Sequence, residues 1–269
     1  MKDWIEHEVA AAVAEAQARE GSMTRWRAPL VSYASAADPL FPQLKQIVRA
    51  THLTPEELLP GARSVIAFFL PFEREVARGN RPNRLASEPW AAAYVETNDL
   101  VGVVSRRLAD GLRARGFDAA VQPATANFDK EKLMSDWSHK HVAYIAGLGQ
   151  FGLHQMLITS AGSAGRLGTL VTTASLEATP RSSQPACLYT LDRSCTECVD
   201  NCPVAALTVN GYDRHACYAL CLENAAAHPR HDLAEVCGKC VSVVPCTYID
   251  PVARKLSRPA RPARPARPA

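Results

Sequence analysis

Apolar and polar residues alternate along the chain in a way that predicts helices and strands in turn. Residues 3–20 place apolar side chains at helical spacing, with Glu and Gln between them, and therefore predict an amphipathic helix. The run SVIAFFL at residues 64–70 follows a Pro-Gly pair and precedes a proline. Its short length and its aromatic content predict a buried strand.

A longer helical pattern begins after Ser87 and ends near Gly116. Ser87 is a favourable residue at the start of a helix, because its hydroxyl can accept a hydrogen bond from a free backbone amide. Pro89 is tolerated in the first turn, where its missing amide has no partner to lose. Glycine is common just past the last turn, so Gly116 marks the end of this helix.

The remaining pattern before residue 175 gives two more strands and one more helical region. Val121 lies in an expected strand, residues 129–146 are expected to be mainly helical, and LGTLVTT at residues 167–173 predicts another strand. Helices thus alternate with strands, so residues 1–175 are expected to form a layered α/β domain. The polar stretch at residues 176–186 contains two prolines and is expected to be a linker.

The last third of the chain has a different composition. Residues 187–250 contain all nine cysteines, and residues 251–269 end in Arg-Pro-Ala triplets, which predict a disordered basic tail. Six basic residues and no acid follow Pro251, so the formal net charge of +3 becomes −3 when the tail is left out. Net charge therefore gives no argument for nucleic-acid binding by the body of the protein.

The cysteines are expected to be reduced and to bind metal. Asp3, Glu6 and Glu8 occupy positions where a signal peptide would need apolar residues, and no apolar run approaches the ~20 residues of a membrane span. We therefore expect a cytoplasmic protein with no membrane partner. Disulfides are rare in that compartment, so clustered cysteines indicate a metal centre.

The cysteine spacing is that of a ferredoxin with two clusters. Cys195, Cys198 and Cys202, followed by a proline, fill the last three places of C-x2-C-x2-C-x3-C-P, whose final cysteine serves the other cluster. The first place falls on Asp192, and Cys187 is the nearest replacement. A second group comprises Cys237, Cys240 and Cys246, with Cys217 and Cys221 between the two groups.

Crossed pairing gives one set of ligands to each of two [4Fe–4S] clusters. The first set is Cys187, Cys195, Cys198 and Cys246, and the second is Cys202, Cys217, Cys237 and Cys240. Cys221 is left over, although it could exchange with Cys217, one helical turn away. The main alternative is a structural zinc ion on Cys195, Cys198, Cys237 and Cys240, which would ignore the other five cysteines.

A second motif lies between the α/β pattern and the cysteines. Gly147, Gly149 and Gly152 form G-x-G-x-x-G, but the preceding stretch looks helical and no acid follows at the spacing of a dinucleotide site. We expect either a turn that closes a helix or a close backbone approach to another large cofactor. A second glycine-rich loop, which includes Ser163 and Gly165, could close over a ligand.

Polar side chains precede the first glycine motif. On a helix, His141 and Tyr144 would share one face, and Asp136 and Lys140 would share another. Titratable groups beside a glycine turn predict a site. The candidate catalytic residues are Asp136, His139 and Tyr144, with the Tyr144 phenol as a possible proton source. The candidate cofactor-binding residues are His141, Gly147, Gly149, Gly152, Ser163 and Gly165.

These segments together resemble the epoxyqueuosine reductase family, which is related to the reductive dehalogenases. The resemblance rests on HVAYIAGLGQFG at residues 141–152, MLIT at 156–159, GSAGRLGTLVT at 162–172 and CTECVDNCP at 195–203. It implies a cobalamin-binding-like α/β domain followed by a ferredoxin-like module with two clusters. Electrons from an external ferredoxin or flavodoxin would pass through the clusters to a corrinoid, which would reduce the substrate.

The resemblance leaves the substrate and the role of the chain open. Longer members of the family continue into helical repeats that grip tRNA, whereas this chain stops soon after Cys246. We therefore expect a small-molecule or modified-nucleoside substrate rather than a whole tRNA. Two alternatives are a non-catalytic electron-transfer protein and an activator that reduces the corrinoid of a partner protein.

Overall fold

The computed structural model describes residues 1–124 and 128–257 of the chain. Its main sheet has four strands in the order β1-β2-β8-β3, and every neighbouring pair is antiparallel. The strands are β1 (Leu30–Ser35), β2 (Ser64–Pro71), β8 (Gly165–Thr172) and β3 (Ala119–Val121). Every residue of β2 is buried, because this apolar strand lies at the centre of the sheet between β1 and β8.

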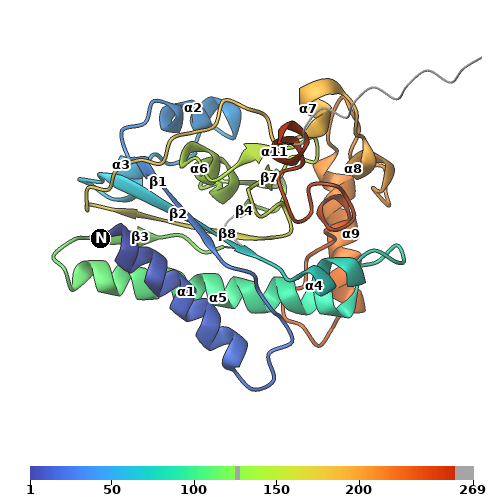
Figure 1. The fold of residues 1–269 in the computed structure, drawn as a ribbon, viewed down its shortest axis with the longest axis horizontal. Coiled ribbons are helices and arrows are strands. Elements are labelled where there is room, and N and C mark those ends of the chain that lie inside the picture. The colour runs from blue at the N-terminus through green and yellow to red at the C-terminus, as the bar shows by residue number, and fades with distance from the viewer. Residues whose placement is uncertain (125–127, 258–269) are drawn as a thin grey trace, which may run out of the picture.

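Helices cover both faces of this sheet, so the α/β part has three layers (Figure 1). On one face lie α1 (Lys2–Ala18) and α5 (Glu88–Arg113), which pack on each other, and α5 also packs on β8. On the other face lie α2 (Leu40–Ile47) and α6 (His139–Ile145). The predicted layered α/β fold is therefore confirmed.

Several predicted elements are found close to their expected positions. The helix predicted at residues 3–20 is α1, and the strands predicted at 64–70 and 167–173 are β2 and β8. The Ser87 hydroxyl accepts a hydrogen bond from the backbone amide of Trp90 at the start of α5. Gly116 follows α5 with a φ of 83°, a conformation that glycine adopts without steric cost.

The prediction of a mainly helical region at residues 129–146 is wrong. Most of it is an irregular hairpin of β4 (Phe128–Asp129) and β5 (Met134–Ser135), and α6 begins only at His139. The Asp129 carboxylate accepts hydrogen bonds from the backbone amides of Glu131 and Lys132. These bonds form a tight turn that competes with helix formation, as short acidic side chains commonly do.

The cysteine-containing part packs against the same body (Figure 1). Its helices are α7 (Leu188–Asp192), α8 (Glu197–Asp200), α9 (Arg214–Ala227), α10 (Lys239–Ser242) and α11 (Pro251–Leu256). Short elements α3 (Pro55–Leu58), α4 (Arg74–Gly79), β6 (Gln150–Phe151) and β7 (Leu157–Ile158) complete the description. No helix within the described ranges is long and apolar enough to cross a bilayer.

Buried polar contacts join the α/β part to the cysteine-containing part. The Asn80 side chain donates to the backbone carbonyl of Cys237 at 2.9 Å, and the Lys239 ammonium donates to the carbonyls of Asn80 and Pro82. Residues 176–186 contain no helix or strand, yet Arg181 in this stretch binds Asp38. The domain boundaries therefore stay a prediction, since the proposed linker is itself held against the body.

The start of the predicted disordered tail needs a correction. Residues 251–256 form α11, whose first turn is capped by the Asp250 carboxylate through the amides of Val252 and Ala253. Pro251 suits the first helical position because its missing amide needs no partner there. The Arg-Pro-Ala triplets that begin at Arg258 lie outside the described residues.

Candidate functional site

The cysteine side chains gather in two groups that combine distant parts of the chain. In the first group, burial and the nearby thiols of Cys187 and Cys195 together raise the pKa of Cys198 to about 12. Burial also raises the pKa of Cys246, and the same three thiols add to the effect. Cys246 thus lies with the first motif, although 44 residues separate it from Cys202 in the sequence.

The second group contains the last cysteine of the first motif. Burial raises the pKa of Cys240, and nearby Cys237, Cys217, Cys198 and Cys202 act in the same direction. Burial likewise raises the pKa of Cys237, again with contributions from Cys217 and Cys202. This arrangement is the crossed one that the spacing predicts for two ferredoxin-type clusters.

Asp192 is held away from the cysteines. Its carboxylate pairs with Lys255 on α11 and accepts a hydrogen bond from the Ser194 amide, and these contacts lower the pKa of Asp192 to about 2. Cys187 instead contributes a thiol next to Cys195 and Cys198. The replacement of Asp192 by Cys187 therefore fits the geometry.

Cys217 and Cys221 lie one turn apart on α9. A hydrogen bond between their thiols lowers the pKa of Cys217 to about 6 and raises that of Cys221. Cys217 is the one whose charge acts most strongly on Cys237 and Cys240. Both thiols line the same two cavities, so the choice of Cys217 over Cys221 as the ligand stays a prediction.

A cavity of about 270 Å³ lies against the second group. Five cysteines line it: Cys202, Cys217, Cys221, Cys237 and Cys240. The indole N–H of Trp90 also faces this wall. It is a buried donor without a hydrogen-bond partner within the described residues, and it packs against Gly238. A cavity lined by cysteines, with a spare donor, fits a sulfur-rich cluster, whose sulfur atoms accept hydrogen bonds.

The described residues show no ligand group suited to a single metal ion. Within the part of the chain that the structure describes, no three His, Cys, Asp or Glu side chains converge as ligands of a single ion. The alternative zinc site requires Cys195 and Cys198 to meet Cys237 and Cys240 around such an ion. The described residues therefore do not show that zinc site, and the choice of clusters over zinc stays a prediction.

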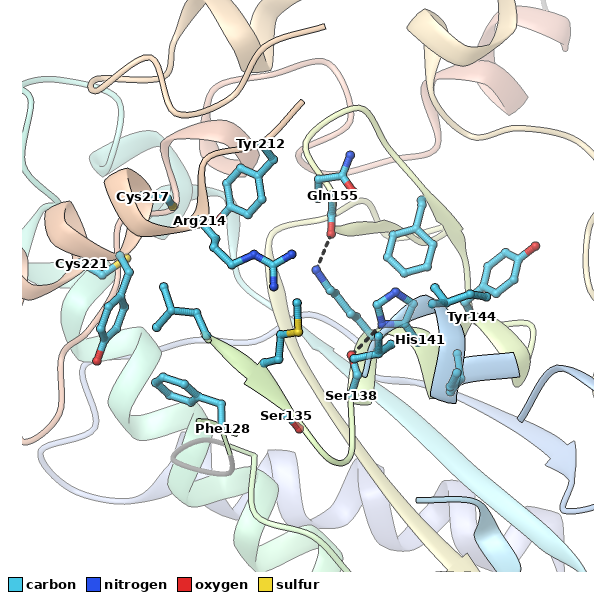
Figure 2. Close-up of a pocket in the computed structure, with 18 of the residues that line it drawn as sticks. Phe128, Ser135, Ser138, His141, Tyr144, Gln155, Tyr212, Arg214, Cys217 and Cys221 are labelled. Carbon is cyan, nitrogen blue, oxygen red and sulfur yellow. Dashed lines mark hydrogen bonds between the residues drawn. The ribbon is translucent and has the colours of Figure 1, made fainter. Parts of the chain in front are cut away.

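A larger cavity of about 740 Å³ adjoins the cysteine-lined one. His141 and Tyr144 of α6 line one side, and Tyr212, Arg214 and Cys217 line the opposite side (Figure 2). Most of the remaining wall is apolar, from α2 and the β4–β5 hairpin. The two cavities share several lining residues, which are Tyr94, Lys140, Gln155, Tyr212, Cys217, Cys221 and Glu235.

Two cations line the larger cavity without a carboxylate within 4.0 Å among the described residues. Lys140 donates to the backbone carbonyl of Gln155 at 3.0 Å, and burial lowers its pKa, with a further contribution from Arg214. Arg214 donates to the backbone carbonyl of Lys132 at 3.5 Å. Neither cation was singled out as a cavity residue by sequence reasoning, because only folding brings α6 and α9 face to face.

The candidate catalytic residues do not form one group. Tyr144 lines the larger cavity, as does His141. The rings of both lie within 6 Å of Phe151, which confirms that they share a face of α6. Burial lowers the pKa of His141 to about 4, so the ring is neutral near pH 7.

Asp136 and His139 point elsewhere. Asp136 lies before α6, where it pairs with Arg49 at 3.2 Å and accepts a hydrogen bond from Thr51, so the expected shared face with Lys140 is absent. The His139 ring is held by Thr169 and by the carbonyl of Pro123 at 2.8 and 2.9 Å. Neither residue lines the larger cavity among the residues described.

The glycines of the first motif are needed for packing within the chain. A Cβ atom on Gly149 would lie 2.5 Å from the carbonyl oxygen of Ile158, and one on Gly152 would lie 2.8 Å from the His154 ring. Gly147 has a φ of 76° and ends α6. Gly147 and Gly149 line a separate hollow beside β1 and α11, so their contact with a cofactor stays a prediction.

The second glycine-rich loop is closer to the cysteines. Ser163 and Gly165 line the 270 Å³ cavity. The Ser163 hydroxyl and amide both donate to the backbone carbonyl of Cys246. This loop therefore supports a candidate cluster ligand directly, and its role against a corrinoid stays a prediction.

Comparison with solved structures supports this reading of the fold. A selenomethionine-labelled epoxyqueuosine reductase matches with a TM-score of 0.55 and 19% identity, over 81% of this chain and 61% of that one. The Streptococcus thermophilus enzyme matches with a TM-score of 0.53 and 16% identity, over 82% of this chain and 65% of that one. The Bacillus subtilis enzyme matches with a TM-score of 0.52 and 17% identity, over 81% of this chain and 61% of that one.

The chain therefore spans about three fifths to two thirds of the length of these proteins. No protein-family model matches the sequence. No curated protein sequence matches it either. At these identities the comparison establishes the architecture, and the chain has the fold of the epoxyqueuosine reductases.

Proposed function

We propose that this protein is a cytoplasmic iron–sulfur reductase that uses cobalamin and two [4Fe–4S] clusters. An external donor of the ferredoxin or flavodoxin type would supply the electrons, and the substrate would be a small molecule or a modified nucleoside. A bound cobalamin would supply the reducing chemistry at the substrate. The shared fold supports this proposal, since epoxyqueuosine reductases are among the proteins that it matches.

One observation carries the proposal. The cysteine-lined cavity and the larger apolar cavity meet along a common wall that includes Lys140, Tyr212 and Cys217. A cluster on the second group of cysteines would thus lie next to the space for a large organic cofactor and its substrate. Short separation between redox centres is what electron transfer requires, and a purely structural cluster would gain nothing from it.

The residues of the larger cavity suggest how a ligand is held. Its apolar walls would exclude water, which strengthens electrostatic contacts inside the cavity. Lys140 and Arg214 have no carboxylate within 4.0 Å in the described part of the chain, and they suit an anionic group on the cofactor or substrate. The phenol of Tyr144 is the titratable group from the predicted catalytic set that lines this space, so it is our candidate proton donor.

Anaerobic reconstitution with iron, sulfide and cobalamin tests the proposal. We expect about eight irons per chain, broad absorption that bleaches with dithionite, and cobalamin that stays bound during gel filtration. Stoichiometric zinc without acid-labile sulfide would contradict the proposal. Full clusters without cobalamin would favour the electron-transfer protein, and cobalamin reduction only in a partner would favour the activator.

A cavity-filling variant locates the cofactor. Met134 lines the larger cavity, so Met134→Trp should weaken cobalamin binding by about tenfold, or roughly 1.4 kcal/mol, while the iron content stays the same. Met23 is 54% exposed and lies outside both cavities, so Met23→Trp is the matched control. Equal affinities of the two variants would place the cofactor elsewhere.

A further inference from the structure

A buried histidine contacts one of the candidate cluster ligands. His154 lies in the turn between β6 and β7, only 5% of its surface is exposed, and its Nε2 atom is 3.3 Å from the Sγ atom of Cys246. The sequence motifs did not single out this residue. The contact joins positions 92 residues apart, so it depends entirely on the fold.

The other ring nitrogen determines the direction of this hydrogen bond. The backbone amide of Met156 donates to Nδ1 of His154 at 3.1 Å. An amide N–H can only donate, so Nδ1 must offer its lone pair, and the hydrogen of the neutral ring is on Nε2. His154 therefore donates an N–H to the sulfur of Cys246.

The ring has little freedom to leave this position. A Cβ atom on Gly152 would lie 2.8 Å from Cε1 of His154 and 3.0 Å from its Nε2 atom, so the ring packs against the bare backbone of Gly152. The Gly152 amide in turn donates to the Met156 carbonyl at 2.9 Å, which closes the turn around the ring. Donor and sulfur are thus positioned before any cluster binds.

We propose that His154 is a positioning residue that raises the reduction potential of the cluster held by Cys187, Cys195, Cys198 and Cys246. This inference rests on the proposed function, because it requires that cluster. Reduction adds one negative charge to the cluster and its thiolates, and an N–H donor stabilises the more negative state more strongly. Loss of the donor therefore makes reduction harder.

The position of this cluster relative to the cavities explains how a raised reduction potential would help electron transfer. The second group of cysteines lines the 270 Å³ cavity beside the larger one. No cysteine of the first group lines that cavity among the described residues, although His154, which contacts Cys246, does. The first cluster is thus the more distant from the substrate space. A raised potential favours its reduction by the external donor.

Two substitutions separate the hydrogen bond from the packing. His154→Phe keeps a ring of similar size but has no N–H, whereas His154→Gln is smaller and keeps an amide donor. Each protein is reconstituted anaerobically with iron and sulfide, its iron content is measured, and both clusters are titrated with redox mediators by electron paramagnetic resonance. A Cys187→Ser variant, which lacks the first cluster, assigns the two signals.

We expect His154→Phe to lower the reduced-to-oxidised ratio of the first cluster about tenfold at a fixed potential, equivalent to about 59 mV for one electron. The cavity-side cluster should keep its potential and is the internal control. His154→Gln should stay close to the wild type. An unchanged first cluster in His154→Phe, or equal shifts in both variants, would overturn the proposal.

A measurement on the unmodified sequence guards against misfolding of the variants. In wild-type protein labelled with 15N-histidine, the reduced first cluster should show a magnetic coupling to a histidine nitrogen, and absence of this coupling would refute the contact. If the wild-type chain binds no iron and sulfide, the proposed function fails, and the inference fails with it. If the iron content is normal but the His154 substitutions leave the potential of the first cluster unchanged, the inference fails while the proposed function stands.

Discussion

Ser163 holds Cys246 through two hydrogen bonds to a single carbonyl oxygen. The backbone amide of Ser163 donates to the Cys246 carbonyl at 2.9 Å, and the Ser163 hydroxyl donates to the same atom at 3.1 Å. Both residues are buried, although 83 positions separate them. The glycine-rich loop at residues 162–165 thus fixes the backbone of a candidate cluster ligand rather than remaining a free flap.

Ser163→Ala should lower stability without removing the cluster. The amide hydrogen bond remains, but the buried hydroxyl contact is lost, which costs about 1 kcal/mol. The thermal midpoint should therefore fall by about 2–4 °C at unchanged iron content. Ser160→Ala, at an exposed position two residues before this loop, is the control. Loss of iron in Ser163→Ala would show that the hydroxyl is essential for cluster binding.

Cys187→Ser should lose one cluster, whereas Asp192→Asn should keep both. Cys187 lies with Cys195 and Cys198, while the Asp192 carboxylate is paired with Lys255. We expect about four irons per chain in Cys187→Ser and about eight in Asp192→Asn. Iron and acid-labile sulfide analysis after identical reconstitution checks this result. The reverse pattern would mean that Asp192 leaves its ion pair to become a ligand.

Cys217→Ser should also lose a cluster, and Cys221→Ser should not. The charge of Cys217 acts on both Cys237 and Cys240, so its thiol is the better fourth member of the second group. The two variants are matched because both positions lie on α9, one turn apart. Iron counts distinguish them, and a loss seen only in Cys221→Ser would reverse the assignment.

Gly149→Ala should destabilise the fold even when no cofactor is present. Its methyl group would lie 2.5 Å from the Ile158 carbonyl oxygen, so the β6–β7 hairpin would have to move, at a cost of about 1–3 kcal/mol. Gly211→Ala is the control, because a Cβ atom there would meet no atom within 4 Å. Thermal melting of both variants without cobalamin checks this prediction. Equal midpoints would leave cofactor approach as the explanation for Gly149.

Stability should fall in mild acid partly because of His139. Burial lowers the pKa of His139 to about 4 in the folded chain, against about 6.5 in the unfolded one. Between these values the unfolded state binds more protons, so stability decreases as the pH falls from about 6.5 towards 4. His139→Gln cannot titrate, and its thermal midpoint should decline less from pH 7 to pH 5. Parallel declines would mean that other groups dominate.

The sequence alone determined the elements whose periodicity is strong. The apolar stripes of α1 and α5 and the apolar run of β2 are local features, and a local pattern is sufficient to identify them. The spacing of Cys195, Cys198 and Cys202 also predicted two crossed groups, because the ferredoxin motif encodes that sharing. Strand β1 was missed, since only half of its residues are buried and its apolar pattern is weak.

Only the tertiary structure decided which distant side chains meet. Asp136 looked like a partner of Lys140, but the turn made by Asp129 breaks the expected helix, and Arg49 binds Asp136 instead. The contact between His154 and Cys246 requires the packing of a hairpin against the last cysteine segment, which no local spacing reveals. Local periodicity follows from backbone geometry, whereas long-range contacts follow from the packing of complete elements. The candidate site is built from such long-range contacts.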